Sequence, residues 1–212
     1  MRPPQDWRRA RLTIAIAGAT AAAFLLVWMA GANDRVANWA GFQPYRFGFD
    51  GYAEGAPVWL TPLTATFVHA GWLHLLFNLL ILLFCGRSVE NVLGPISLAL
   101  LYVLGAYAAA AGHYAMDPGS IGVMIGASGA ASAVIGAYAM LFGRNKVKVS
   151  NPTLALWLNA LWLLAGWIVL QLVIGVASRR ADLAIAVGAH IGGFVVGVAL
   201  ARPLLMLRYR KA

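Results

Sequence analysis

The sequence predicts an all-α membrane protein, a bundle of six transmembrane helices with both termini in the cytoplasm. Hydrophobic residues make up 61% of the 212 residues and charged residues only 11%, against roughly 25% charged residues in a soluble domain. Six apolar stretches reach the length of about 20 residues that a membrane-spanning helix needs. Lys and Arg also concentrate in alternate connecting segments, a pattern that orients membrane proteins.

The six stretches are expected to be helices because lipid offers no hydrogen-bond partner to an open strand edge. None of them alternates with period two as a barrel strand does. The second stretch is interrupted late by Arg87 and Glu90. We expect a single membrane domain over residues 1–212. Its expected spans are 12–30, 73–93, 96–116, 121–142, 154–177 and 183–201, with a long outer loop at 31–60.

The first stretch has one alternative, a cleavable signal peptide. A basic start, an apolar run and the sequence Ala30-Gly31-Ala32 superficially resemble one. The apolar run is longer than the usual signal-peptide core, and its removal would leave five spans. We therefore favour a transmembrane helix.

The outer loop at 31–60 is rich in aromatic residues, which favour the headgroup depth of a membrane. Its glycines and prolines predict turns and short helical pieces. Two interpretations are equally open: pieces that lie in the interface, or a loop that packs on the bundle. The aromatic residues are Trp39, Phe42, Tyr45, Phe47, Phe49, Tyr52 and Trp59.

Charge placement orients the bundle and accounts for most of the net charge of +9. Nucleic acid is not an expected partner, because little polar surface remains to carry a basic groove. The single cysteine, Cys85, allows no intrachain disulfide or cysteine cluster, and we expect neither a metal nor a cofactor. The expected inner segments hold Arg2, Arg8, Arg9, Arg11, Arg87, Arg144, Lys146, Lys148, Arg202, Arg208, Arg210 and Lys211, and the outer segments Arg35, Arg46, Arg179 and Arg180.

Polar side chains inside a span are costly, so each is a candidate functional residue. His74 and Asn78 lie four residues apart, which places them on one face of a helix. Both can donate hydrogen bonds to a developing negative oxygen. The alternative is a pair that only bonds neighbouring helices together.

Ser128 lies in a run of small residues from Gly126 to Ser132. Gly126 and Gly129 would let a substrate backbone approach the hydroxyl and leave backbone N–H groups free to bind an oxyanion. The alternative is a helix-packing face in which the serine bonds only its own helix.

His190 is followed at i+3 and i+7 by Gly193 and Gly197, so the histidine face of its helix is bare. Such a face can press against the small residues around Ser128 and bring the imidazole to the hydroxyl. Asp182, the only acid nearby in sequence, is eight positions away, about 12 Å along a helix. We therefore expect a Ser–His dyad rather than a triad.

Together these residues resemble the rhomboid family of intramembrane serine proteases. The stretch from His69 to Asn78 is similar to the family's HxxxxHxxxN pattern on the second helix. Gly126-Ala127-Ser128-Gly129 resembles its GxSG nucleophile motif, and the stretch from Ala189 to Gly197 its AHxxGxxxG base motif. The three motifs occur in order on the second, fourth and sixth spans.

The resemblance implies that Ser128 attacks the scissile carbonyl and that His190 takes and returns the proton. His74, Asn78 and the backbone N–H of Ser128 would hold the oxyanion, and Gly193 and Gly197 would be packing residues. It also implies a structural role for Glu90, with the fifth helix and the outer loop at 178–182 as cap and gate. The expected partners are transmembrane protein substrates and the lipid bilayer, and the expected location is a bacterial inner membrane.

Two departures from the family pattern bear on this function. The first outer loop lacks a Trp-Arg pair, and Ser132 stands where relatives often place an aromatic ring against the base histidine. A non-proteolytic relative that binds membrane clients is therefore the nearest alternative. A b-type haem protein and a proton-coupled transporter are more distant ones, the latter disfavoured because every Asp and Glu lies at a span end or in a loop.

Overall fold

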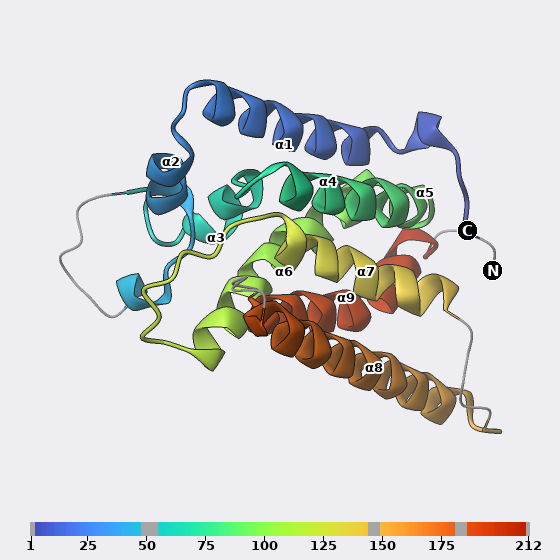
Figure 1. The fold of residues 1–212 in the computed structure, drawn as a ribbon. Helices are drawn as coiled ribbons and strands as arrows, with labels where there is room; N and C mark the ends of the chain where they lie inside the picture. Colours follow the sequence, from blue (N-terminus) through green and yellow to red (C-terminus); the bar gives the residue numbers. More distant parts are fainter. Residues whose placement is uncertain (1–2, 48–54, 144–148, 181–185, 211–212) are drawn as a thin grey trace.

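The computed structural model describes residues 3–47, 55–143, 149–180 and 186–210. Within these ranges the secondary structure is helical, apart from one isolated β-bridge. The main helices are α1 (Arg11–Met29), α2 (Asn33–Ala40), α3 (Thr61–Thr64), α4 (Trp72–Ile81), α5 (Arg87–Leu93), α6 (Pro95–Met116), α7 (Ser128–Phe142), α8 (Pro152–Arg180) and α9 (Val187–Arg208) (Figure 1).

Five helical stretches of the described chain are long and apolar enough to cross a membrane, as an all-helical membrane protein requires. They are Arg11–Met29, Trp72–Leu93, Pro95–Met116, Pro152–Val173 and Val187–Arg208. The second joins α4 and α5 through a π-helical turn at Leu82–Gly86. The sixth apolar helix, α7, has 15 residues and is shorter. Six complete crossings stay a prediction.

The expected span at 121–142 is wrong at its beginning, because the helix starts only at Ser128. Met124 instead pairs with Phe42 through two backbone hydrogen bonds of 2.8 and 3.0 Å. Gly126 has φ +106°, a left-handed conformation that favours glycine, and donates its N–H to Ala65 O at 2.9 Å. Ser128 therefore stands at the first turn of a helix rather than inside one.

The sixth expected span also differs at its end. α9 runs to Arg208 with Pro203 inside it, whereas the charges from Arg202 onwards predicted an end at residue 201. Residues 183–185 of that span, and 181–182 of the expected gate loop, lie outside the described residues, while α8 includes the loop's first three positions.

The centre of the bundle is the contact of α6, α7 and α9, where small residues bring backbones together. A Cβ built on Gly193 or Gly197 would collide with the backbone of α7, and one on Gly192 with Ala108 of α6. Helices can approach so closely only where side chains are small. This contact fixes α9 against α7 and so positions His190 relative to Ser128.

Glu90 ties the beginning of α1 to the first turn of α5. Its side chain is 2% exposed, and its carboxylate oxygens accept hydrogen bonds from the N–H groups of Leu12 and Thr13 at 2.9 and 2.8 Å. Thr13 Oγ1 donates a third at 2.7 Å. A carboxylate at a helix N-terminus pairs otherwise unbonded N–H groups and complements the helix dipole. These contacts give Glu90 the structural role that the family resemblance implied.

Part of the first outer loop packs on the bundle, as one of the two interpretations of its sequence expects. Phe42 is buried and packs with Ala65 and Ala110 of the bundle. Trp39 on α2 is 55% exposed, and Trp59 is 63% exposed. Residues 48–54, with two of the aromatic positions, lie outside the described chain.

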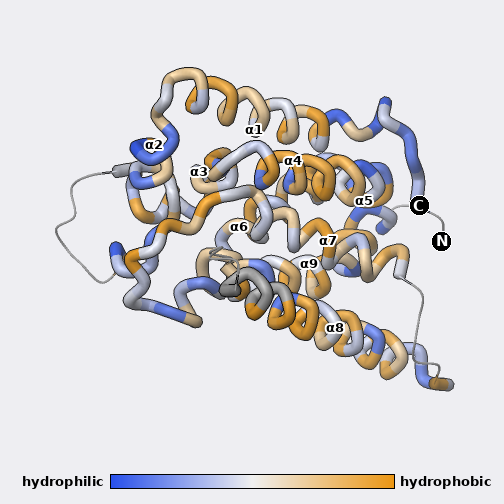
Figure 2. Tube along the Cα trace, viewed as in Figure 1, coloured by the Kyte–Doolittle hydropathy of each residue, from blue (hydrophilic) through white to orange (hydrophobic). Residues whose placement is uncertain are grey.

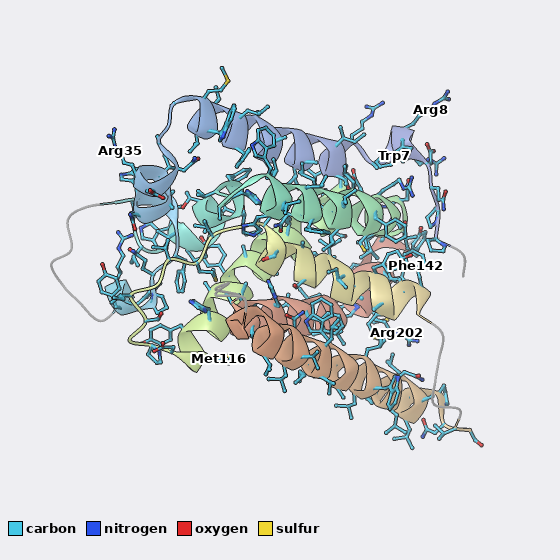
Figure 3. The ribbon with its side chains drawn as sticks, in the orientation of Figure 1. Trp7, Arg8, Arg35, Met116, Phe142 and Arg202 are labelled. Carbon is cyan, nitrogen blue, oxygen red and sulfur yellow. The ribbon has the colours of Figure 1, made fainter. Side chains whose placement is uncertain are left out.

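Polar segments gather at the two ends of the bundle. Figure 2 shows hydrophobic colouring along the long helices and hydrophilic colouring around α2 and the segment before α1. Arg8 and Arg202 lie toward one end and Arg35 toward the other (Figure 3). The chain before α1 and the end of α9 both contact α5, through Asn91 Nδ2 donating to Asp6 O and Tyr209 Oη to Val92 O. The two ends of the described chain therefore share one end of the bundle.

Candidate active site

Ser128 and His190 meet where α7 and α9 begin. Ser128 is the first residue of α7 and His190 lies in the first turn of α9, and both are half-buried. The distance from Ser128 Oγ to His190 Nε2 is 2.8 Å. Hydrogen-bond reach between a hydroxyl and an imidazole is the basic requirement for a base-activated nucleophile.

His190 is also held from α8. Its Nδ1 lies 2.8 Å from Gln171 Oε1, and its backbone carbonyl accepts a hydrogen bond of 3.1 Å from Trp167 Nε1. The Trp167 ring stacks on Phe194, one turn after the histidine, with centroids 4.7 Å apart and an angle of 8°. Contacts from α8 therefore hold both the ring and the backbone of His190.

Ser132 has a different contact in this chain. Its hydroxyl donates to Ser128 O at 2.8 Å. A Cβ built on Gly193 would lie 3.2 Å from Ser132 Cβ. A large ring at position 132 would therefore push α9 away from α7.

His74 and Asn78 lie on one face of α4, as their spacing predicts. Asn78 Nδ2 donates to His74 O at 2.7 Å. A Cβ built on Gly126 would lie 2.5 Å from His74 Nε2, so the imidazole rests against the backbone two residues before Ser128. Among the described residues Asn78 Oδ1 is buried without a hydrogen-bond partner. The edge of the His74 ring thus lies beside the loop before Ser128, and Asn78 lies one turn further along α4.

His69 supports the loop before Ser128. Its Nε2 lies 3.4 Å from the N–H of Ala127, which donates to it, and its ring lies 5.0 Å from that of His74. Burial, followed by the nearby His74, lowers the pKa of His69 from 6.5 to about 4. The imidazole is therefore neutral near pH 7, as an acceptor must be.

The beginning of α7 also supplies unpaired donors. The first N–H groups of any helix have no partner within it, and they carry the positive end of its dipole. Since α7 begins at Ser128, its own N–H is one of these groups, and Gly129 leaves no side chain over the next one. The arrangement can activate a hydroxyl and stabilise an oxyanion on the same side.

Gln171 and Trp167 are the residues that sequence reasoning missed. Gln171 and Asn159 are the only residues with amide side chains in the expected span 154–177. A search for every polar side chain in a span would therefore have found Gln171. The sequence could not predict that Gln171 faces His190, because that depends on how α8 lies against α9.

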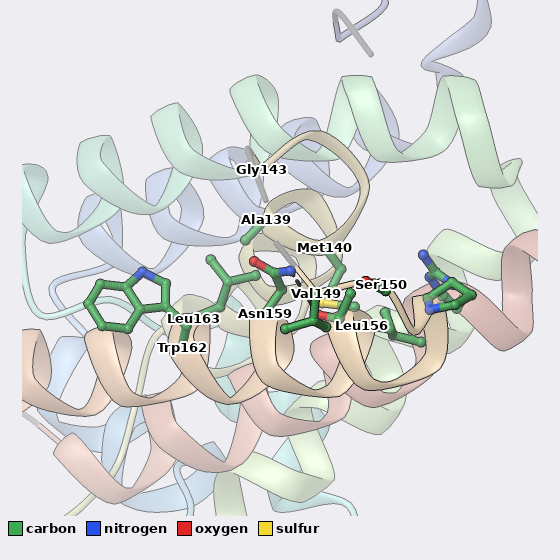
Figure 4. A pocket seen from close by; sticks show the side chains of 12 residues that line it. Ala139, Met140, Gly143, Val149, Ser150, Leu156, Asn159, Trp162 and Leu163 are labelled. Atoms are coloured by element: carbon green, nitrogen blue, oxygen red, sulfur yellow. Dashed lines mark hydrogen bonds between the residues drawn. The ribbon is translucent and has the colours of Figure 1, made fainter. Parts of the chain in front are cut away.

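A separate cavity of about 330 Å³ lies at the other end of α7, away from Ser128 (Figure 4). It is lined by Met140 of α7, Asn159 and Trp162 of α8, and Arg202 of α9. None of the predicted site residues lines it. Within the described ranges no group of three or more His, Cys, Asp or Glu side chains is placed to hold a metal ion.

Comparisons with known proteins agree on one family. The model of the Rhomboid domain matches residues 57–207. RHOMBOID-like protein 1 of Arabidopsis thaliana is 28% identical over 137 residues, which cover 65% of this chain and 32% of that protein. Rhomboid protease GlpG of Yersinia pestis (strain Pestoides F) is 29% identical over 137 residues, covering 64% of this chain and 44% of that protein. The chain thus spans less than half the length of these relatives. Because the domain model matches well over half of it, the chain belongs to the rhomboid family.

Proposed function

We propose that this integral membrane protein is a serine endopeptidase that hydrolyses peptide bonds in or near the transmembrane segments of other membrane proteins. Ser128 is the nucleophile and His190 the base of its catalytic dyad. The observation that supports this most is the 2.8 Å distance from Ser128 Oγ to His190 Nε2. The similarity to proteins named rhomboid protease supports the same reaction.

In the proposed mechanism Ser128 gives its proton to His190 Nε2 as Oγ attacks the carbonyl carbon of the scissile bond. The resulting imidazolium returns that proton to the leaving amine, and the C–N bond breaks to leave an acyl-enzyme. Water then attacks the ester with His190 again as base, which releases the acid product and restores the serine. No cofactor takes part in any step.

The negative oxygen formed in each half of the reaction needs donors aimed at it. The backbone N–H of Ser128 and the side chains of His74 and Asn78 are the proposed donors. Gly126 and Gly129 keep side chains out of the path of the substrate backbone, and Gly193 and Gly197 let α9 bring His190 close. Mutation of each of these residues tests its role.

The proposed topology is a single membrane domain over 1–212 with six crossings and both termini in the cytoplasm of a bacterium, at its inner membrane. Arg8 and Arg202 lie toward the end of the bundle where α1 begins and α9 ends (Figure 3). Lys and Arg favour the cytoplasmic side. Under this topology Ser128 lies nearer the outer side.

The test is cleavage of a reporter transmembrane substrate by the purified protein in detergent and in liposomes. Ser128→Ala and His190→Ala are purified in parallel, and each is expected to lose turnover by about 10⁴-fold or more because the two residues act as a unit. Labelling of Ser128 by a fluorophosphonate probe measures nucleophile reactivity without a substrate.

Three outcomes separate the alternatives. Cleavage and labelling by wild type, with neither in the two variants, support the protease. Labelling without cleavage of any reporter would leave an active nucleophile that needs another substrate. If wild type neither cleaves nor labels, the proposal fails, and binding of membrane clients without hydrolysis takes its place.

A further inference from the structure

We propose that Gln171 of α8 is a positioning residue for His190, holding the imidazole in the tautomer that can accept the Ser128 proton. The inference rests on the proposed function. It extends the dyad by a neutral third member supplied by a helix that contributes no other residue to the proposed chemistry.

The first support is the pairing of both ring nitrogens. Nε2 of His190 faces Ser128 Oγ, and Nδ1 faces Gln171 Oε1, each at 2.8 Å. A carbonyl oxygen only accepts hydrogen bonds, so Nδ1 must carry the ring proton. In the neutral imidazole Nε2 then has the lone pair, and the serine hydroxyl donates to it. The other tautomer would point an N–H at the nucleophile and could not act as its base.

The second support is the burial of an amide on a helix that is otherwise largely exposed. Gln171 is 3% exposed, whereas Val169, Leu170 and Leu172 around it are 47–60% exposed. A buried amide in hydrocarbon is unfavourable unless it is hydrogen-bonded, and an aliphatic side chain would avoid that cost. Among the described residues, the one partner of the Gln171 side chain is the His190 ring.

The third support is a second contact from the same helix to the same histidine. Trp167, one turn before Gln171, donates its indole N–H to the carbonyl of His190 at 3.1 Å and stacks on Phe194. Both contacts come from the second half of α8. The first half of this helix lines the separate cavity (Figure 4). The backbone and the ring of His190 are therefore oriented together by residues 167–171.

The contact also depends on the position of α8. A hydrogen bond of 2.8 Å is lost when its atoms part by roughly 0.7 Å, the margin to the usual limit of about 3.5 Å. Helices that are not locked by a close backbone contact can shift by this amount. The state of the base is thus linked to how closely α8 lies against α9.

The test replaces Gln171 by methionine, which has a similar shape and no amide oxygen. Asn159→Leu is the matched control, because it removes another buried amide of α8 at the cavity, away from the dyad. Two readouts are used: ¹⁵N NMR shifts of the His190 side chain, which report the tautomer, and the rate of fluorophosphonate labelling of the folded fraction. Gln171→Glu is the rescue variant, since it keeps an accepting oxygen at this position.

We expect Gln171→Met to mix the two tautomers and to slow labelling by about 10- to 100-fold, the loss typical when the partner that orients a metal-bound histidine is removed. Gln171→Glu should keep the wild-type tautomer and label within about tenfold of wild type, and Asn159→Leu should match wild type in both. Gln171→Met with the wild-type tautomer and rate would overturn the proposal, and so would a rate that falls equally in Asn159→Leu.

Ser128→Ala separates the two proposals. If wild type labels and Ser128→Ala does not, a result against Gln171 counts only against this inference. If wild type does not label at all, the proposed function fails, and the tautomer spectrum alone decides whether Gln171 holds the ring.

Discussion

Replacing Gly197 by alanine tests whether the contact of α7 with α9 sets the distance within the dyad. A Cβ at this position would lie 2.7 Å from the carbonyl carbon of Ala133 and closer still to its oxygen. Ordinary contact begins at 3.4 Å. The two backbones must therefore separate by more than roughly 0.7 Å, because the oxygen lies closer than the carbon. The same separation at the dyad would lengthen its 2.8 Å hydrogen bond beyond about 3.5 Å.

The expected effects are large enough to measure in two ways. Overpacking of this kind costs about 1–3 kcal/mol, and a displacement of about 1 Å at reacting groups can cost ~100-fold in rate. We therefore expect Gly197→Ala to lose stability in unfolding by a denaturing detergent and to slow fluorophosphonate labelling by at least about tenfold. Gly166→Ala is the control, because a Cβ there meets no atom within 4 Å, and a helical Gly→Ala exchange stabilises by about 1 kcal/mol.

Two results would refute this reasoning. A Gly197→Ala protein as stable as Gly166→Ala would mean that the backbones are not in limiting contact. A destabilised protein whose folded fraction labels at the wild-type rate would mean that the spacing of α7 and α9 does not control the dyad.

Three further predictions concern Glu90, Gly126 and His69. Glu90→Gln should lower the free energy of unfolding by about 3 kcal/mol, because the amide turns a donor toward the N–H groups at the start of α1; unchanged stability in detergent titration would contradict this. Gly126→Ala should slow labelling of Ser128, because alanine strains a φ of +106° and its Cβ meets His74. His69 has its folded pKa, about 4, below the unfolded value of 6.5, because of burial, so its contribution to stability is complete above pH 6.5 and is lost as pH falls toward 4. Unfolding measured across this range should depend less steeply on pH in His69→Phe.

The all-helical fold followed from the sequence because a span must be apolar throughout and charges mark its ends. These constraints act within one segment, and the described helices begin or end within a few residues of most predicted bounds. The prediction was wrong at residues 121–127, which are apolar enough for a helix but lie before the start of α7. The bridge from Met124 to Phe42 is a contact between distant segments, and of the local signals only Gly122 and Gly126 indicated it.

The proposed dyad was predictable because its members lie in recognisable motifs and because glycines after His190 imply a close helix contact. The hydrogen bond from His190 to Gln171 was not. It depends on the rotation of α8 about its axis, and two amides in an otherwise apolar helix do not reveal which of them reaches His190. The close approach of Gly193 to Ser132 was equally hidden, since it depends on how α9 lies against α7.

The short length of α7 has a consequence for the products of the proposed reaction. Its 15 residues span roughly 22 Å, about 8 Å less than the hydrocarbon core of a bilayer. With Phe142 at the inner boundary, Ser128 would lie about 8 Å beneath the outer one, a depth that an extended chain covers in two to three residues. A substrate cut there would be divided unequally. Nearly all of its membrane anchor would stay with the inner fragment, and the outer fragment would keep too few apolar residues to remain in the bilayer.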